Sequence, residues 1–429
     1  MGETVIQQKK KGRSRNLILH LHPPKVNKAS IRFTLTFGLG GMAAVLFILQ
    51  VFTGVLLRFG YVASPAEAYD SILTLQNNIL FGQLTRNIHH WSGIFFVIIA
   101  FMHLLRTFYT GAFYYERRWN WIIGLALMVV VILSNFTGYL LPWDQLAYWA
   151  VTVSTSLLRY VPLVGDRLTE FVRGGQEVGS ATLLIFYNFH SAILPLTLVL
   201  LMVFHFWRVR KNKGVVVAEN SSKKMVPADP YLISKELVTA LALIAFILLM
   251  SIFFNAPLQE RADPAFSPNP AKAPWYFMGI QELLLHFHPL VASFIIPLIF
   301  LIALIWLPFL KYGKQHRGIW FFTPKGKKLT VVAVIISLLF TLSAILISEY
   351  LIDFESWLGG MPSIISNGLI PLIIIFGIIL VIIFFVKKKY QPDKSELILF
   401  IFSFLMMSYT VLSIIGIWFR GPGMVLGWY

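Results

Sequence analysis

Long apolar runs separated by short polar stretches follow one another along the whole chain. A helix needs about 20 mostly apolar residues to cross a lipid bilayer, and nine segments meet this requirement. They are approximately residues 33–57, 88–109, 121–140, 183–207, 233–254, 290–310, 329–350, 366–386 and 396–418. The pattern predicts an all-α integral membrane protein with about nine transmembrane helices.

Charge adds an orientation to this prediction. The chain has 36 Lys and Arg residues against 19 Asp and Glu, a net charge of +17. If the N-terminus is inside, most of the basic residues fall in the inner segments and most of the acidic ones in the outer segments, as the positive-inside rule requires. The C-terminus then lies outside. The basic residues are dispersed over these segments. We therefore expect them to orient the chain in the lipid bilayer and not to bind nucleic acid.

The chain contains no cysteine. This absence excludes disulfides, thiol catalysis, cysteine-ligated zinc, iron–sulfur clusters and thioether-attached haem on this chain. Any redox chemistry here must use other ligands.

Four histidines recur at matched positions on two of the predicted helices. His89 and His103 are 14 residues apart on the second helix, and His190 and His205 are 15 apart on the fourth. On a helix, residues 14 and 15 positions apart point within about 40° and 60° of the same direction. The two histidines of each helix are about 21 Å apart along its axis. His89 can therefore face His190 near the outer side, and His103 can face His205 further in. Each pair offers two axial ligands to a haem iron.

Two alternatives accompany this hypothesis. The histidines could be ordinary buried or interfacial ones, but ionisable residues inside membrane helices are costly and usually functional. His90 could replace His89 as a ligand, although the 14-residue spacing favours His89.

A second pattern repeats the same spacing on the flanking helices. Gly40 and Gly54 lie 14 residues apart on the first helix, and Gly124 and Gly138 on the third. Glycine leaves the helix surface free of side chains, so these positions could clear space for a flat macrocycle or could serve plain helix packing. Two arginines lie three residues from a histidine, near the predicted membrane edges, where they could meet haem propionates or extend towards water. They are Arg86 and Arg106.

Several separated motifs together resemble the cytochrome b family, the dihaem subunit of Rieske/cytochrome b quinol oxidoreductase complexes. The stretches are LHPPKVN (21–27), GLGG…QVFTG (38–54), RNIHHWSG…MHLLRTFYTGAF (86–113), GYLLPWDQLAYWA (138–150), FYNFHSAILP (186–195) and APWYF (273–277). The 15-residue histidine spacing is similar to that of the chloroplast and Gram-positive branch. The resemblance implies that branch's cytochrome b fused to its subunit IV.

The resemblance carries expectations for cofactors, partners and organisation. It implies two non-covalent b haems, quinol oxidation near the outer face coupled to proton translocation, a Rieske iron–sulfur protein, a c-type cytochrome and a homodimeric complex in a bacterial cytoplasmic membrane. It divides the chain into a haem-binding four-helix bundle (1–210), a subunit-IV-like part (211–350) and two additional helices with a tail (351–429). An inner quinone pocket is expected near Lys25, Arg32 and Arg210, although each of these could be an orientation signal only.

Two departures from the family pattern affect the chemistry. Gly38 occupies the position of the cysteine that holds an extra covalent haem, so such a haem is excluded. The outer quinol motif Pro-Glu-Trp-Tyr reads Ala273-Pro274-Trp275-Tyr276, so its proton-accepting glutamate is missing. Candidate acceptors in the outer loops are Glu282, Asp144, His286 and His288. We favour Glu282, whose apolar surroundings should raise its pKa, with Tyr276 as a hydrogen-bonding partner or ring wall.

Two other functions are compatible with parts of the pattern. A dihaem membrane anchor could serve a non-Rieske partner such as a molybdenum or multihaem enzyme. A transporter would show broken helices or charged residues near the midplane, and the histidine pairs argue against it. The final segment, FRGPGMVLGWY (419–429), could dock a partner subunit or act as an aromatic anchor at the interface.

Overall fold

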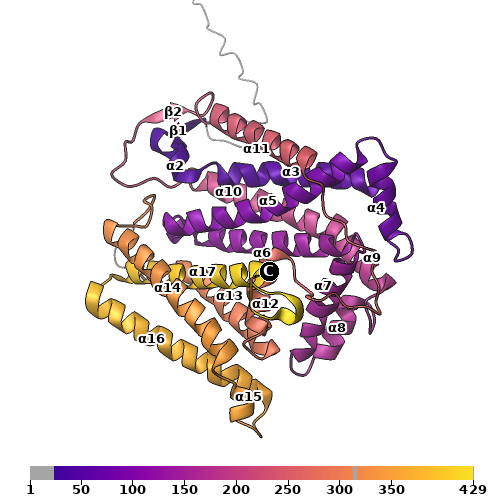
Figure 1. Ribbon diagram of the computed structural model, residues 1–429. Coiled ribbons are helices and arrows are strands. Elements are labelled where there is room, and N and C mark those ends of the chain that lie inside the picture. Colours follow the sequence, from indigo (N-terminus) through magenta and orange to yellow (C-terminus); the bar gives the residue numbers. More distant parts are fainter. Residues whose placement is uncertain (1–23, 313–315, 429) are drawn as a thin grey trace, which may run out of the picture.

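The computed structural model describes residues 24–312 and 316–428, and within them nine helices are long and apolar enough to cross a membrane (Figure 1). All nine predicted spans are confirmed. They are Leu39–Arg58 (α3), Gly82–Tyr109 (α5), Tyr115–Leu140 (η2 and α6), Ser180–Lys211 (α9, η4 and α10), Ile233–Phe253 (α11), Val291–Phe309 (η6, α13 and η7), Pro324–Tyr350 (α14), Ile365–Tyr390 (η8 and α16) and Lys394–Trp418 (α17). The basic tail predicted to be cytoplasmic, residues 1–23, lies outside the described residues.

The first span begins later than the hydropathy suggests. A short helix, α2 (Phe33–Thr36), precedes it, and the chain then turns through Phe37 and Gly38, which have φ of 50° and 67°. This left-handed conformation ends a right-handed helix and favours glycine. The long helix α3 therefore starts at Leu39 rather than near residue 33.

Helices α3, α5 (Gly82–Tyr109), α6 (Arg118–Leu140) and α10 (Leu194–Lys211) form the first bundle. Their apolar faces meet in one core that contains Leu46, Phe96, Val131 and Leu198. Helix α11 adds to this core through Ile247. In Figure 1 the helices of the bundle run side by side across the middle of the molecule.

Both ends of this bundle are covered by short elements. At one end lie α4 (Ala68–Asn77), α7 (Gln145–Ser156), η3 (Leu157–Tyr160), α8 (Gly165–Arg173) and α9 (Ser180–Asn188). Residues 141–182, between the third and fourth predicted spans, are therefore largely helical. At the other end, η1 (Lys28–Ile31) follows strand β1 (Lys25–Asn27), which pairs antiparallel with β2 (Met225–Pro227). The linker after α10 thus returns to the N-terminal segment.

The last two spans occupy different places. Helix α17 packs against both α14 and α12 (Met278–Leu284), and in Figure 1 it lies next to α6 of the first bundle. It also reaches the first bundle, because the rings of Phe402 and Phe108 stack at 3.7 Å. Helix α16 (Ile370–Tyr390) lies at the lower edge of the view. The remaining elements are η5 (Trp275–Phe277), α15 (Phe354–Trp357) and η9 (Pro422–Met424).

Candidate functional site

The predicted histidine pairs come together in space. On α5 and η4, the ring centroids of His89 and His190 lie 6.0 Å apart at an interplanar angle of 79°. On α5 and α10, those of His103 and His205 lie 6.3 Å apart at 72°. A histidine nitrogen binds a metal at about 2 Å, which places two rings on opposite sides of one iron with their centres roughly 6 Å apart. Both pairs fit this separation.

Hydrogen bonds orient the His89–His190 pair. Thr53 donates its hydroxyl hydrogen to the carbonyl of Leu49 at 2.6 Å, so its oxygen is left to accept from Nδ1 of His89 at 2.9 Å. Nδ1 of His190 lies 2.9 Å from the carbonyl oxygen of Ser134, which can only accept. Both rings therefore carry their proton on Nδ1. This tautomer leaves Nε2 with a free lone pair, as a metal ligand requires.

Each of the four glycines lies against one of the four histidines. A methyl group in place of the glycine hydrogen would lie 3.2 Å from Cε1 of His89 at Gly54 and 3.1 Å from Cε1 of His103 at Gly40. On α6, a methyl group at Gly138 would lie 2.5 Å from Cε1 of His190. One at Gly124 would lie 3.8 Å from Cε1 of His205. The glycines therefore make room for the imidazoles, a relationship that sequence spacing did not reveal.

His90, the alternative ligand, lies elsewhere. Its ring packs edge-on against Trp91 with centroids 5.2 Å apart, whereas His89 faces His190. The structure thus favours His89 over His90.

Arg86 and Arg106 have different surroundings, although each lies three residues from a histidine. Arg86 is buried, and its two terminal nitrogens donate to the carbonyls of Ala256 and Pro257 at 2.8 and 2.7 Å. These bonds tie α5 to the loop after α11, and a contact of Arg86 with a haem propionate stays a prediction. Arg106 is also buried and donates through Nε to Leu35, but its Nη2 has no partner in the described parts of the chain. An unpaired buried donor fits an anionic group such as a haem propionate.

Comparison with known proteins agrees with this arrangement. Residues 25–213 match the family model "Cytochrome b/b6/petB". Over 190 residues the chain is 39% identical to cytochrome b6 of Synechococcus elongatus, which covers 44% of this chain and 85% of that protein. Cytochrome b6 of Prochlorococcus marinus is 38% identical over 190 residues, with 44% and 84% covered. The chain belongs to the cytochrome b family. It is a membrane protein of electron transport, which leaves the transporter alternative without support.

The fold of this cytochrome b extends beyond the matched region. A chain of a structure described as "Hyperthermophilic respiratory Complex III" superposes with a TM-score of 0.67 at 23% identity, covering 94% of this chain and 96% of that one. Because 94% of this chain is covered, the shared fold extends beyond residue 213 and into the last part of the chain, residues 351–429.

The segment Ala273–Tyr276 leads into α12. Tyr276 packs against the core of the first bundle, and Phe277 meets Phe136 of α6 with ring centroids 5.6 Å apart. The Tyr276 hydroxyl is buried and has no hydrogen-bond partner among the residues the structure describes. Burial raises the pKa of this tyrosine, so the hydroxyl stays protonated and available as a donor. A role of Tyr276 as a hydrogen-bonding partner of a quinol stays a prediction.

Glu282, favoured as proton acceptor, is not in the predicted environment. Its side chain is fully buried, and it forms an ion pair with Arg420 at 2.6 Å and contacts His286 at 3.3 Å. Burial alone would raise its pKa, but the hydrogen bonds from His286 and Arg420 and the charge of Arg420 outweigh burial and lower the pKa. The expectation of a raised pKa is wrong, because the apolar sequence around Glu282 gave no sign of a distant arginine.

The other candidate acceptors have structural partners. Asp144 is buried and accepts from the backbone nitrogens of Ala147 and Gln259 at 2.9 and 3.1 Å, so it caps α7 and holds the loop after α11. Burial raises its pKa despite these hydrogen bonds. The ring of His288 lies edge-on against Tyr160 at 5.5 Å.

At the opposite end, a groove of about 610 Å³ lies between α3 and α11. Its lining is mostly apolar and includes Phe33, Met42, Thr239 and Lys235. None of the residues expected there, Lys25, Arg32 and Arg210, is among the lining residues. Lys25 and Arg210 are exposed. The basic residue that lines this groove is Lys235, and an inner quinone pocket near Lys25, Arg32 and Arg210 stays a prediction.

Proposed function

We propose that this chain is the dihaem cytochrome b subunit of a quinol-oxidising Rieske/cytochrome b complex. The proposal is supported mainly by two pairs of facing histidines at different positions along the bundle. The ring centroids of His89 and His190 lie 6.0 Å apart, and those of His103 and His205 lie 6.3 Å apart. Two b haems held between them would supply an electron path across the membrane.

The protein's own contribution is to fix this path. The four histidines would hold the two irons, with Thr53 and Ser134 keeping the outer imidazoles in the ligand tautomer. The four glycines allow the rings to lie against α3 and α6. Arg106 would neutralise a propionate of the inner haem.

At the outer face, Tyr276 would orient the quinol. Its buried hydroxyl, which has no partner within the described chain, can donate to a quinone oxygen. At the inner face, the groove beside Lys235 and Thr239 would take a quinone, because it is mostly apolar with one charged group. Moving one charge across the membrane potential is worth about 2.3 kcal/mol per 100 mV, so the arrangement would couple oxidation to proton translocation.

The partners follow from the same proposal. Since this chain has no cysteine, an iron–sulfur cluster and a c-type haem must be carried by other subunits, a Rieske protein and a c-type cytochrome. We expect the complex to be a homodimer in a bacterial cytoplasmic membrane, with the N-terminus of this chain inside and the C-terminus outside. The segment between α10 and α11, residues 212–232, would separate the haem-binding part from the subunit-IV-like part. The third part would not be separate from the second, because its helix α17 packs against α12 and α14.

A second candidate is a dihaem anchor for a molybdenum or multihaem partner. Pro274 in place of the motif's glutamate favours it, because the outer site lacks its usual proton acceptor. Identification of the subunits that co-purify with the chain separates the two: a Rieske protein supports the first proposal, and a molybdenum or multihaem subunit the second.

The haem assignment has a direct test. The purified complex should show a b-type reduced-minus-oxidised spectrum and two haems per chain. A His103→Ala/His205→Ala variant should lose one haem and keep the other. Absence of a b-type signal, or full haem content in the double variant, would overturn the assignment.

A further inference from the structure

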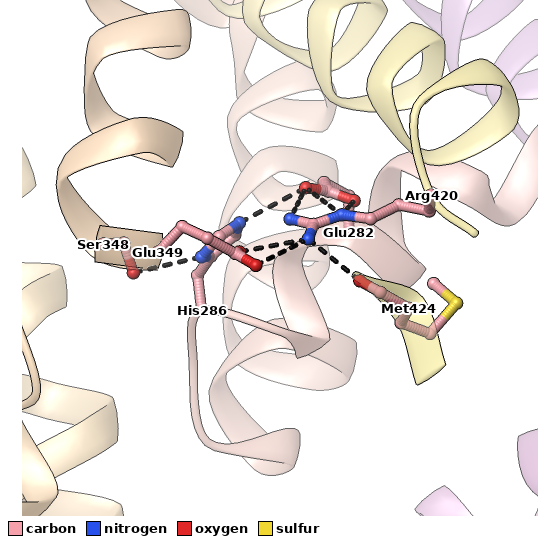
Figure 2. Close-up of polar contacts among 6 residues, drawn as sticks. All are labelled: Glu282, His286, Ser348, Glu349, Arg420 and Met424. Carbon is pink, nitrogen blue, oxygen red and sulfur yellow. Dashed lines mark hydrogen bonds and ion pairs between the residues drawn. The ribbon is translucent and has the colours of Figure 1, made fainter. Parts of the chain in front are cut away.

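A buried cluster of charged side chains joins three parts of the chain that are distant in sequence (Figure 2). Arg420, in the segment after α17, donates to both carboxylate oxygens of Glu282 on α12, at 2.6 to 3.2 Å. Its Nη1 donates to both oxygens of Glu349, in the last turn of α14, at 3.0 Å. His286 contacts Glu282 at 3.3 Å and Ser348 at 3.0 Å.

The burial of this cluster makes its geometry specific. The side chains of Arg420 and Glu282 are 1% and 0% exposed, whereas that of Glu349 is 24% exposed. A guanidinium is a rigid planar fork, so two carboxylates bonded to it are fixed in relative position. Arg420 therefore sets where α12 lies with respect to the outer end of α14.

Further contacts from the C-terminal part reach the same outer loop. The Tyr409 hydroxyl of α17 donates to the backbone carbonyl of Tyr276 at 2.8 Å. Lys272 donates to the carbonyl of Ile417 at 2.9 Å, and the backbone nitrogen of Gly423 donates to Asn269 at 2.5 Å. These bonds hold the chain before and within the Ala273–Tyr276 motif, and Arg420 holds α12, which follows the motif, through Glu282.

Helices α12 and α17 approach each other closely because a glycine on each helix faces a side chain of the other. A methyl group at Gly279 of α12 would lie 2.6 Å from the Tyr409 ring, and one at Gly416 of α17 would lie 3.1 Å from Met278. Such close packing leaves α12 little freedom to slide or rotate along α17.

We propose that residues 394–428 form a positioning element of the outer quinol site and that Arg420 is its principal positioning residue. This inference rests on the proposed function. Arg420 fixes α12 against α14 and α17. It thereby fixes the position and rotation of the turn η5, which precedes α12 and carries Tyr276. The position of the Tyr276 hydroxyl follows from that turn. The substrate class is a lipid-soluble quinol, which Tyr276 contacts and Arg420 does not.

The test uses the complete complex purified with its partner subunits. Arg420→Gln removes the charge, Arg420→Lys keeps it without the fork, and Tyr409→Phe removes only the hydroxyl that holds the Tyr276 carbonyl. Arg159→Gln, which breaks an exposed outer pair with Asp166 at 3.9 Å, is the matched control. Steady-state oxidation is measured with a short-chain benzoquinol and a short-chain naphthoquinol, alongside the haem content and the reduction of the haems by dithionite.

We expect Arg420→Gln to raise the quinol KM about tenfold or more, as misplacement of a binding group does, with haem content and spectra unchanged. Arg420→Lys should restore part of the affinity, Tyr409→Phe should raise KM severalfold, and the control should match the wild type. An assembled Arg420→Gln complex with wild-type KM overturns the inference. If that variant does not assemble, Tyr409→Phe decides, and an unchanged KM overturns it. A wild-type complex that oxidises neither quinol overturns the proposed function instead.

Discussion

Gly138 of α6 lies directly against the imidazole of His190 on the neighbouring helix, with room for no side chain between them. A methyl group at residue 138 would lie 2.5 Å from Cε1 of His190, whereas one at Gly124 would lie 3.8 Å from Cε1 of His205. The first distance is far inside van der Waals contact, and the second is an ordinary contact. Two glycines with the same apparent role in the sequence therefore differ in how strictly the fold requires them.

Gly138→Ala should therefore displace the His190 ring and lower the content of the outer haem, leaving about one haem per chain. Gly124→Ala, the same substitution on the same helix, should keep both haems. A pyridine haemochrome assay on purified protein measures the difference. Equal haem content in the two variants would contradict the prediction.

Thr53→Val should weaken the outer haem site without affecting the inner one. The substitution removes the acceptor for Nδ1 of His89, and loss of such a partner costs about 1 kcal/mol or more and typically 10- to 100-fold in metal affinity. Redox titration of the two haems in the variant checks this. We expect the potential or the occupancy of the outer haem alone to change, and a shift confined to the inner haem would refute the assigned pairing.

Glu282→Gln should alter stability in acid but not the pH profile of turnover. Because the pKa of Glu282 is lowered from 4.5, its ion pair stabilises the protein above that ordinary value and is lost as the pH falls through the lowered pKa. The wild type should therefore lose more stability than the variant when acidified below about pH 4.5. Thermal unfolding in detergent at several pH values measures this.

The same variant distinguishes positioning from proton transfer. Glu282 remains ionised between about pH 5 and 8, so the pH profile of quinol oxidation in this range should keep its shape in Glu282→Gln while KM rises. A profile that loses one ionisation in the variant would instead restore Glu282 as the proton acceptor.

Thr239→Phe should fill the groove between α3 and α11 and slow quinone-dependent reoxidation of the haems about tenfold or more. Leu237→Phe is the matched control, since Leu237 lies on the same helix, is 57% exposed and does not line the groove. Stopped-flow reoxidation of the reduced complex by a short-chain quinone gives the rates. Equal rates in the two variants would exclude the groove as the inner quinone site.

Much of the architecture follows from the sequence alone. Backbone polar groups in a bilayer must be satisfied within each segment, so a long apolar run in this chain has to be a helix. The nine membrane-spanning helices within the described residues were predictable for that reason. The facing of His89 with His190 and of His103 with His205 also followed, because helical periodicity fixes which residues share a face.

Only the tertiary structure decided what surrounds these groups. Arg86 and Arg106 have the same spacing from a histidine. Arg86 is bonded to two carbonyls of a distant loop, whereas Arg106 keeps one donor that has no partner among the residues the structure describes. The pKa of Glu282 changed direction because Arg420, 138 residues away in sequence, lies against it. Local sequence determines hydropathy and helical face, which act over a few residues. The charge balance of a buried group depends on which distant segments pack against it, and that is settled only when the helices assemble.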